Sequence, residues 1–156
     1  MAKTELLARI LAHLNAELTL LTTAALATHA EATDEENKAE DKYDTRGLEA
    51  SYLAHGQSKA AEEAALAVAQ FSALPPRAFA AGEPIGLGAL VRLEDNSRYF
   101  IGPRAGGTEV EYEGKTVLVI TPSSPLGRQL VGRREGDRIA LQLGGKRAEQ
   151  AIAAVV

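Results

Sequence analysis

The sequence predicts an α+β protein: an N-terminal antiparallel α-helical coiled-coil hairpin, residues 1–75, followed by a small, mostly antiparallel β-rich domain, residues 76–156. Two patterns predict this order. Leucines and alanines recur with a period of 3.5 residues in the first half, and apolar and polar residues alternate with a period of two in the second. Pro75-Pro76 separates the two patterns, because proline ends helices.

The first helix is predicted for residues 3–30. Its apolar residues step alternately by four and three, which is the spacing of a coiled-coil seam. They are Leu7, Leu11, Leu14, Leu18, Leu21 and Ala25. Exposed to water, such a seam would be unfavourable, so a partner helix is expected.

The second helix ends near residue 73, and its seam has the same spacing but smaller side chains. The seam residues are Leu53, Gln57, Ala60, Ala64, Ala67 and Phe71. Large residues on one helix pack well against small ones on another, which favours an antiparallel hairpin over a parallel homodimer. Two starts remain open, a capping box at Thr33 and Glu36 and a cap at Asp44-Thr45.

The second half contains six segments with strand character. They are residues 90–94, 98–102, 108–112, 115–121, 138–143 and 148–155. Asp95-Asn96-Ser97 forms the turn of a hairpin between the first two. A short helix is predicted for residues 124–131, with Ser124 as its cap and Pro125 in its first turn.

Charge also divides the chain. Residues 1–75 carry six basic and twelve acidic residues, whereas residues 76–156 carry eleven and nine. The acidic half is not expected to bind nucleic acid directly, because phosphates would be repelled. There is no cysteine, no signal-peptide pattern, and no apolar run that approaches the length of a membrane span, so a cytoplasmic protein is expected.

The acidic residues gather at the expected tip of the hairpin, residues 31–44. Seven carboxylates lie there against Lys38 and Lys42. One interpretation is a solvated loop, or a helix start that favours acidic residues. The other is a functional tip, whose mutual repulsion is compensated by a cation or a basic partner.

The stretch 121–137, TPSSPLGRQLVGRREGD, resembles the C-terminal signature of the bacterial Gre-type transcript cleavage factors. The resemblance implies an FKBP-like C-terminal domain that docks on RNA polymerase and a coiled coil that enters its secondary channel near the RNA 3′ end. It implies an accessory elongation factor rather than an enzyme. Mg²⁺ would be shared with the polymerase and not held tightly by the isolated chain, and the chain would be monomeric and independent of membranes.

The family's tip pattern, Asp-x-x-Glu-Asn-Ala-Glu-Tyr, is partly kept. Asp34 and the pair Ala39-Glu40 match, whereas Asn37, Lys38 and Asp41 depart. A shift of one residue would restore Glu36-Asn37 and break the other matches. The resemblance implies these catalytic candidates: Asp34, Glu36, Glu40 and Asp41, with Asp34 and Glu40 as metal ligands.

Two further groups are candidates for contact with a partner. Tyr43 and Arg46 adjoin the tip and would touch polymerase or RNA. The second group follows the strand at 115–121 and consists of Ser124, Pro125, Arg128 and Arg133. A purely structural role of Ser124 as a helix cap is the alternative.

Three other functions are weighed against cleavage stimulation. A channel-binding regulator without cleavage activity is favoured by the departures at Asn37 and Asp41, and a non-catalytic coiled-coil adaptor is the second. A prolyl isomerase needs an aromatic-lined pocket, for which the second half offers only two phenylalanines and two tyrosines. His13, His29 and His55 lack the spacing of metal ligands.

Overall fold

The computed structural model describes the chain in three stretches, residues 2–33, 46–143 and 145–156. The chain divides into two compact units. The hairpin unit is Ala12–Ala69, and the sheet unit combines Met1–Leu11 with Gln70–Val156. The proposed domain boundary after residue 75 stays a prediction.

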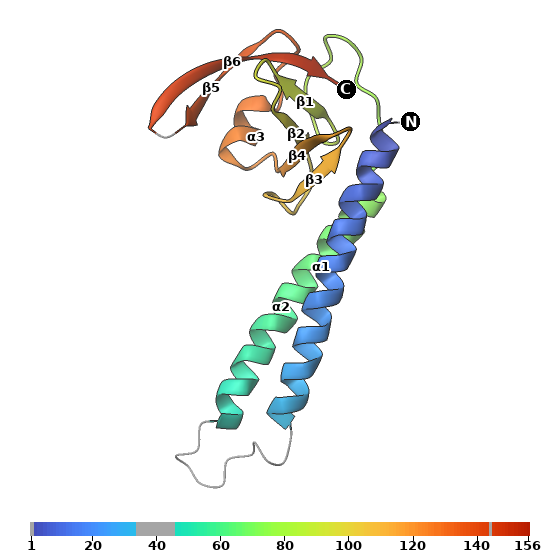
Figure 1. The fold of residues 1–156 in the computed structure, drawn as a ribbon, viewed down its shortest axis with the longest axis vertical. Helices are drawn as coiled ribbons and strands as arrows, with labels where there is room; N and C mark the ends of the chain where they lie inside the picture. Colours follow the sequence, from blue (N-terminus) through green and yellow to red (C-terminus); the bar gives the residue numbers. More distant parts are fainter. Residues whose placement is uncertain (1, 34–45, 144) are drawn as a thin grey trace. The chain divides into compact units, whose positions relative to one another are not determined.

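Two long helices form the hairpin unit and extend into the sheet unit. α1 is Ala2–Thr33, with 32 residues, and α2 is Arg46–Ala73, with 28. Within the hairpin unit they run beside each other in opposite directions (Figure 1). This confirms the predicted antiparallel hairpin. The start of α2 is the later of the two expected ones, and Gly47 lies inside the helix.

The seam of α1 is confirmed along its length. Leu7, Leu14 and Ala25 are buried, and the three seam leucines between them are half-buried. Leu14, in the hairpin unit, is only 2% exposed. The alternation of four and three residues therefore marks the buried face of this helix.

The seam of α2 differs from the prediction at one step. Gln57, Ala64 and Ala67 are half-buried or buried as expected, but Ala60 is exposed and Ala61 is half-buried in its place. The step after Gln57 is thus four residues and not three. Alanine occupies both positions, so the sequence offered no difference in size to fix this step. The side chain of Leu53 is not among those described.

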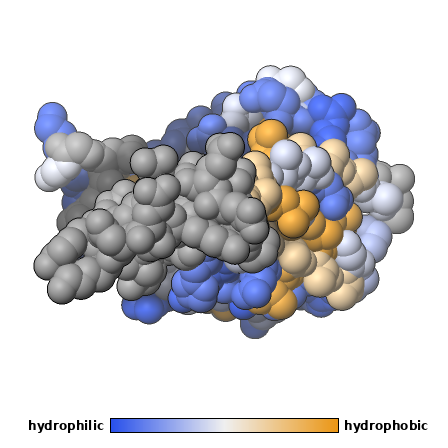
Figure 2. Space-filling model, turned by 90° about the horizontal axis from the view of Figure 1, so that it is seen from below, coloured by the Kyte–Doolittle hydropathy of each residue, from blue (hydrophilic) through white to orange (hydrophobic). Residues whose placement is uncertain are grey.

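One stretch of α1, Lys3–Thr28, is long and apolar enough to cross a membrane by length and composition alone, and 17% of its most apolar window is buried. The expectation that no apolar run has this length is therefore wrong. The finding is weak evidence, since core helices and signal sequences meet the same criteria. Leu20 and Leu26 contribute to it and are 72% and 65% exposed. Figure 2 shows one face of the molecule, on which hydrophobic residues, in orange, gather towards the right of the view beside hydrophilic ones, in blue.

Six strands form one mixed sheet in the order β3-β4-β2-β1-β6-β5. Their bounds are Leu90–Leu93 for β1, Arg98–Ile101 for β2, Glu109–Tyr112 for β3, Lys115–Ile120 for β4, Arg138–Leu143 for β5 and Lys146–Val155 for β6. β2 and β4 are parallel, and every other neighbouring pair is antiparallel. The predicted strands are confirmed, as is the mostly antiparallel character of the sheet.

The core of the sheet unit comes from alternate residues of the strands and from the segment before β1. Val91, Leu93 and Ile101 are fully buried in it, and Ile85 and Ile152 are 2% and 1% exposed. Nearer the helix ends, the rings of Phe71 on α2 and Phe100 on β2 lie 6.2 Å apart between centroids. Phe71 thus ties the last turns of α2 to the sheet.

The turn between β1 and β2 has the predicted chemistry. Asn96 adopts φ 68°, a left-handed conformation that asparagine tolerates. The carboxylate of Asp95 accepts hydrogen bonds from the Ser97 backbone N–H at 2.9 Å and from the Ser97 hydroxyl at 2.5 Å. These two bonds lower the pKa of Asp95 below its usual value.

On each of the two edge strands, β3 and β5, a side chain from outside the sheet forms a hydrogen bond with a backbone group. On β3, the carbonyl oxygen of Glu111 accepts a hydrogen bond from Arg9 Nη1 at 2.9 Å. On β5, the N–H of Ala140 donates to Gln129 Oε1 at 3.1 Å. Both edge strands therefore have a backbone group paired from outside the sheet.

Candidate functional site

The predicted tip residues Asp34, Glu36, Glu40, Asp41 and Tyr43 lie outside the described residues. They belong to the segment that connects the end of α1 to the start of α2. Arg46 is the first residue of α2, but its side chain is not described. The roles given to all six residues stay predictions.

The second predicted group surrounds a short helix, α3, Pro125–Leu130, which follows β4. Ser124 caps this helix, as predicted: its Oγ accepts a hydrogen bond from the Gly127 N–H at 3.0 Å. The same hydroxyl donates to the Thr121 carbonyl oxygen at 2.7 Å. Because its donor and its acceptor are both used internally, Ser124 holds the shape of the turn.

Gly127 allows the close approach that this turn needs. A Cβ atom at residue 127 would lie 1.8 Å from the Thr121 carbonyl oxygen and 2.8 Å from Ser124 Oγ. The first distance is far below any real contact between such atoms. Any larger residue would therefore push the start of α3 away from the end of β4.

Five residues between the end of β4 and the turn after α3 are exposed, and we call them the Ser-Pro surface: Pro122, Ser123, Pro125, Arg128 and Arg133. The two prolines restrict the backbone, and the two arginines supply positive charge. The surface can therefore present a preformed, basic contact area to an acidic partner.

Three hydrogen bonds attach the turn after α3 to the segment before β1. Ile85 N–H donates to the Arg133 carbonyl oxygen at 2.7 Å, and Gly132 N–H donates back to the Ile85 carbonyl oxygen at 2.9 Å. Arg134 Nη1 reaches the Gly82 carbonyl oxygen at 2.5 Å. Sequence reasoning missed the role of residues 82–85, which carry no motif.

A second polar centre, around Lys3, was also missed. Lys3 is 8% exposed, and its Nζ donates to the carbonyl oxygen of Arg77 at 2.6 Å and to that of Val156. The Lys3 ammonium lies 4.8 Å from the ring centroid of Phe79, and the Arg77 guanidinium lies 4.2 Å from it. Burial, and secondarily the charge of Arg77, lowers the pKa of Lys3 from 10.5 to about 8. No local signal could reveal partners that are 74 and 153 residues away.

Comparison with known proteins finds similar solved structures but no matching protein family. No protein-family model matches the chain, and neither does any curated protein. The chain is similar to GreA factor homolog 1 (Gfh1) of Thermus thermophilus, at 23% identity, with 100% of this chain and 96% of that one covered and a TM-score of 0.38. It is also similar to Gfh1 of Thermus aquaticus, at 24% identity, with 99% and 94% covered and a TM-score of 0.39.

A further structure, described as the transcription factor Gfh1, is 25% identical, with 99% of this chain and 94% of that one covered and a TM-score of 0.41. All three TM-scores are below the level at which a whole-chain likeness supports a conclusion. The fold described above therefore rests on the chain's own helices and strands.

Metal binding by the described part of the chain finds no support. Across residues 2–33, 46–143 and 145–156, no three acidic or histidine side chains gather in a way that could hold an ion. His13 and His55 are exposed on the two helices. The tip carboxylates, the predicted metal ligands, lie outside the described residues.

Proposed function

We propose that this chain is an accessory transcription factor of the Gre type, which binds bacterial RNA polymerase and stimulates Mg²⁺-dependent cleavage of backtracked RNA. The observation that carries the proposal is the antiparallel hairpin, because its connecting segment contains six carboxylates between the end of α1 and the start of α2. The resemblance of residues 121–137 to the Gre signature supplies the partner.

The length of the arms supports insertion into the secondary channel. A helix of 28 residues such as α2 spans about 42 Å at a rise of about 1.5 Å per residue. The buried seam of α1 keeps the arms together, so the hairpin can act as a stiff carrier. Such a carrier can deliver side chains from its connecting segment into a deep, narrow site.

Asp34 and Glu40 are the proposed ligands for the catalytic ion. Mg²⁺ in such sites is held by one or two carboxylates with waters and phosphates, so two side chains from an accessory protein suffice. When bound, the ion activates a water molecule and stabilises the leaving oxygen. The part of this chain is to bring negative charge to the polymerase, and Glu36 and Asp41 add to that charge.

The Ser-Pro surface is the proposed docking area on the polymerase. Arg128 and Arg133 are exposed and would face an acidic part of the partner. Ser124 would act by holding the turn in shape, since its hydroxyl is used internally. Tyr43 and Arg46 would contact the polymerase or RNA inside the channel. A protein with this role would act in the cytoplasm.

A second function is favoured by the departures from the family's tip pattern. Asn37 stands where the pattern has glutamate, and Asp41 stands where it has tyrosine. A chain with these changes would enter the channel and regulate transcription without stimulating cleavage. An adaptor that does not bind the polymerase at all is the remaining alternative.

Cleavage of RNA in stalled, backtracked elongation complexes with Mg²⁺ tests the proposal. We expect the wild-type chain to release short 3′ RNA fragments, and the double variant Asp34→Ala/Glu40→Ala to release none while it binds core polymerase as tightly as the wild type. A matched control, Glu17→Ala/Glu62→Ala, removes the same charge from exposed positions on the arms and should cleave normally.

The other outcomes identify the alternatives. A wild-type chain that binds and lowers the yield of transcripts without releasing fragments is a channel-binding regulator. A chain that does not bind core polymerase rejects the proposal. Loss of binding in the Asp34→Ala/Glu40→Ala variant would mean that the tip docks and does not assist chemistry.

A further inference from the structure

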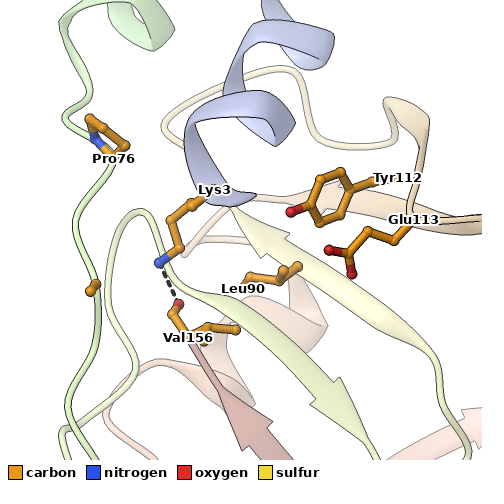
Figure 3. Close-up of a pocket in the computed structure, with 7 residues that line it drawn as sticks. Lys3, Pro76, Leu90, Tyr112, Glu113 and Val156 are labelled. Carbon is orange, nitrogen blue, oxygen red and sulfur yellow. Dashed lines mark hydrogen bonds between the residues drawn. The ribbon is translucent and has the colours of Figure 1, made fainter. Parts of the chain in front are cut away.

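A cavity of about 340 Å³ lies in the sheet unit beside the first turn of α1. Ala78 lines it together with the residues that Figure 3 labels: Lys3, Pro76, Leu90, Tyr112, Glu113 and Val156. This volume is at the lower end of the range for small-molecule pockets, about 300–1,000 Å³. The cavity can therefore admit a small organic molecule.

The walls present mostly hydrocarbon, and part of that hydrocarbon is uncovered. Leu90 and the ring of Tyr112 form the buried part of the wall. Pro76, Ala78 and Val156 are exposed, and the exposed fraction of Val156 is 54%. A molecule that covered these three residues would remove apolar surface from water, which is favourable.

The hydroxyl of Tyr112 has an acceptor within the chain. Tyr112 is only 3% exposed, and the Glu113 carboxylate lines the same cavity. Burial raises the pKa of Tyr112, and the charge of Glu113 and its hydrogen bond with the hydroxyl raise it further. The hydroxyl therefore stays protonated at neutral pH, and its single proton is already donated.

The two charged residues at the cavity have opposite signs and also have partners. Lys3 Nζ donates to two carbonyl oxygens, those of Arg77 and Val156. The Glu113 carboxylate pairs with Arg98 at 3.7 Å. A charged ligand would meet one like charge. A neutral polar group on a ligand would leave water and would have to displace one of these existing bonds, which is unfavourable.

We propose that this cavity binds a small hydrocarbon ring that carries no charge and no hydrogen-bonding group. Water is held poorly there, because the polar side chains of the lining are already engaged and the rest of the wall offers no partners. The ring replaces this water and covers Pro76, Ala78 and Val156. Nothing in this site depends on polymerase binding, so it stands apart from the function proposed above.

Four probes that share a benzene ring test the ligand class on the full chain: toluene, benzyl alcohol, benzoate and benzylammonium. Amide shifts are followed by NMR during each titration. We expect toluene to give saturable shifts at Leu90, Tyr112 and Val156. Benzyl alcohol, which adds one hydroxyl, should bind about fivefold more weakly or worse, because that hydroxyl leaves water without a free partner. Benzoate and benzylammonium should bind more weakly still.

Variants assign the interaction to the cavity. Ala78→Leu narrows the cavity and should abolish the shifts. Ala60→Leu is the matched control, because it adds the same side chain at an exposed position of α2 and should bind toluene like the wild type. Tyr112→Phe keeps the ring in the wall and removes only the hydroxyl, so its affinity for toluene should stay within about twofold of the wild type.

Three results would overturn the proposal: no saturable shifts with toluene up to its solubility limit, binding of benzyl alcohol or a charged probe as tight as that of toluene, or unchanged toluene binding in Ala78→Leu. Shifts at the same amides that depend on protein concentration without any probe would mean that a second copy of the chain fills the cavity, and would also reject it. Thermal unfolding of each variant confirms that the titrated protein is folded.

Discussion

At the scale of single residues, the turn around Ser124 shows what a local motif can reveal. The order Ser-Pro at the start of a short apolar pattern predicts a capped helix, and the structure has this cap with Ser124 Oγ bonded to the Gly127 N–H. The need for glycine at 127 does not follow from the motif. It arises because the Thr121 carbonyl oxygen occupies the space of a side chain.

Gly127→Ala should destabilise the protein by about 1–3 kcal/mol, because the added methyl group forces the backbone of the turn apart. Urea unfolding followed by circular dichroism measures the change. Gly56→Ala is a matched control in α2, where an added Cβ meets nothing within 4 Å. It should stabilise by about 0.5–1 kcal/mol, since alanine favours a helix more than glycine does. Changes of the same sign in both variants would contradict the close approach at Gly127.

Lys3 should make stability depend on pH. The unfolded chain keeps Lys3 protonated up to its ordinary pKa of 10.5, and the folded chain only up to about 8. Between these values the unfolded state binds more protons, so the free energy of unfolding should rise with pH. Below pH 8 the residue is charged in both states, and its unfavourable effect is constant.

Urea unfolding at several pH values between 7 and about 10 measures this rise. At higher pH, tyrosines lose their protons and change the free energy of unfolding in the opposite direction. Lys3→Met should remove the rise, whereas Lys59→Met, an exposed lysine of α2, should keep it. An equal rise in Lys3→Met and the wild type would show that another group is responsible. No sequence pattern predicts this behaviour, because the partners of Lys3 come from distant parts of the chain.

At the scale of elements, the helices were predictable wherever side-chain size marked the seam. The leucines of α1 differ clearly from their neighbours, so its buried face follows from spacing alone. In α2 the seam is built from alanines, which also occupy the exposed positions. Spacing alone could not choose between Ala60 and Ala61, of which the structure exposes Ala60 and half-buries Ala61.

A larger side chain at residue 64 tests whether this seam is packed as described. Ala64 is half-buried, so Ala64→Leu should overpack the contact between the arms and destabilise by about 1–3 kcal/mol. Ala60→Leu introduces the same side chain at an exposed position and should change stability by less than about 0.5 kcal/mol. Thermal and urea unfolding of both variants give the comparison. A larger loss of stability in Ala60→Leu than in Ala64→Leu would show that Ala60 belongs to the seam, as the sequence predicted.

The strands were predictable from alternation, but their partners were not. The apolar residues of β2, RYFI, and of β4, KTVLVI, do not show whether a neighbouring strand is parallel or antiparallel. The parallel pairing of β2 with β4 arises because β3 and β4 form a hairpin that returns with β4, not β3, beside β2. This is a property of the whole sheet.

At the scale of the whole molecule, the change from helical to strand periodicity predicted both kinds of structure. The sequence did not indicate that residues at the start of α1 contribute to the sheet unit. Leu6 and Ile10 are fully buried there, although they look like ordinary members of a helical repeat. The cap at Ser124 follows from local residues, whereas the cavity beside Tyr112 needs segments from five parts of the chain.

The side chains on the outer strands bear on how this protein behaves when concentrated. An open sheet can grow when a strand of another molecule pairs with its free margin, and such growth leads to aggregates. Here Arg9 occupies an outward carbonyl of β3 and Gln129 occupies an outward N–H of β5. An incoming strand would have to displace these side chains, and on β3 it would also meet the exposed carboxylates of Glu109 and Glu111. Both margins are thus guarded against self-association by strand addition.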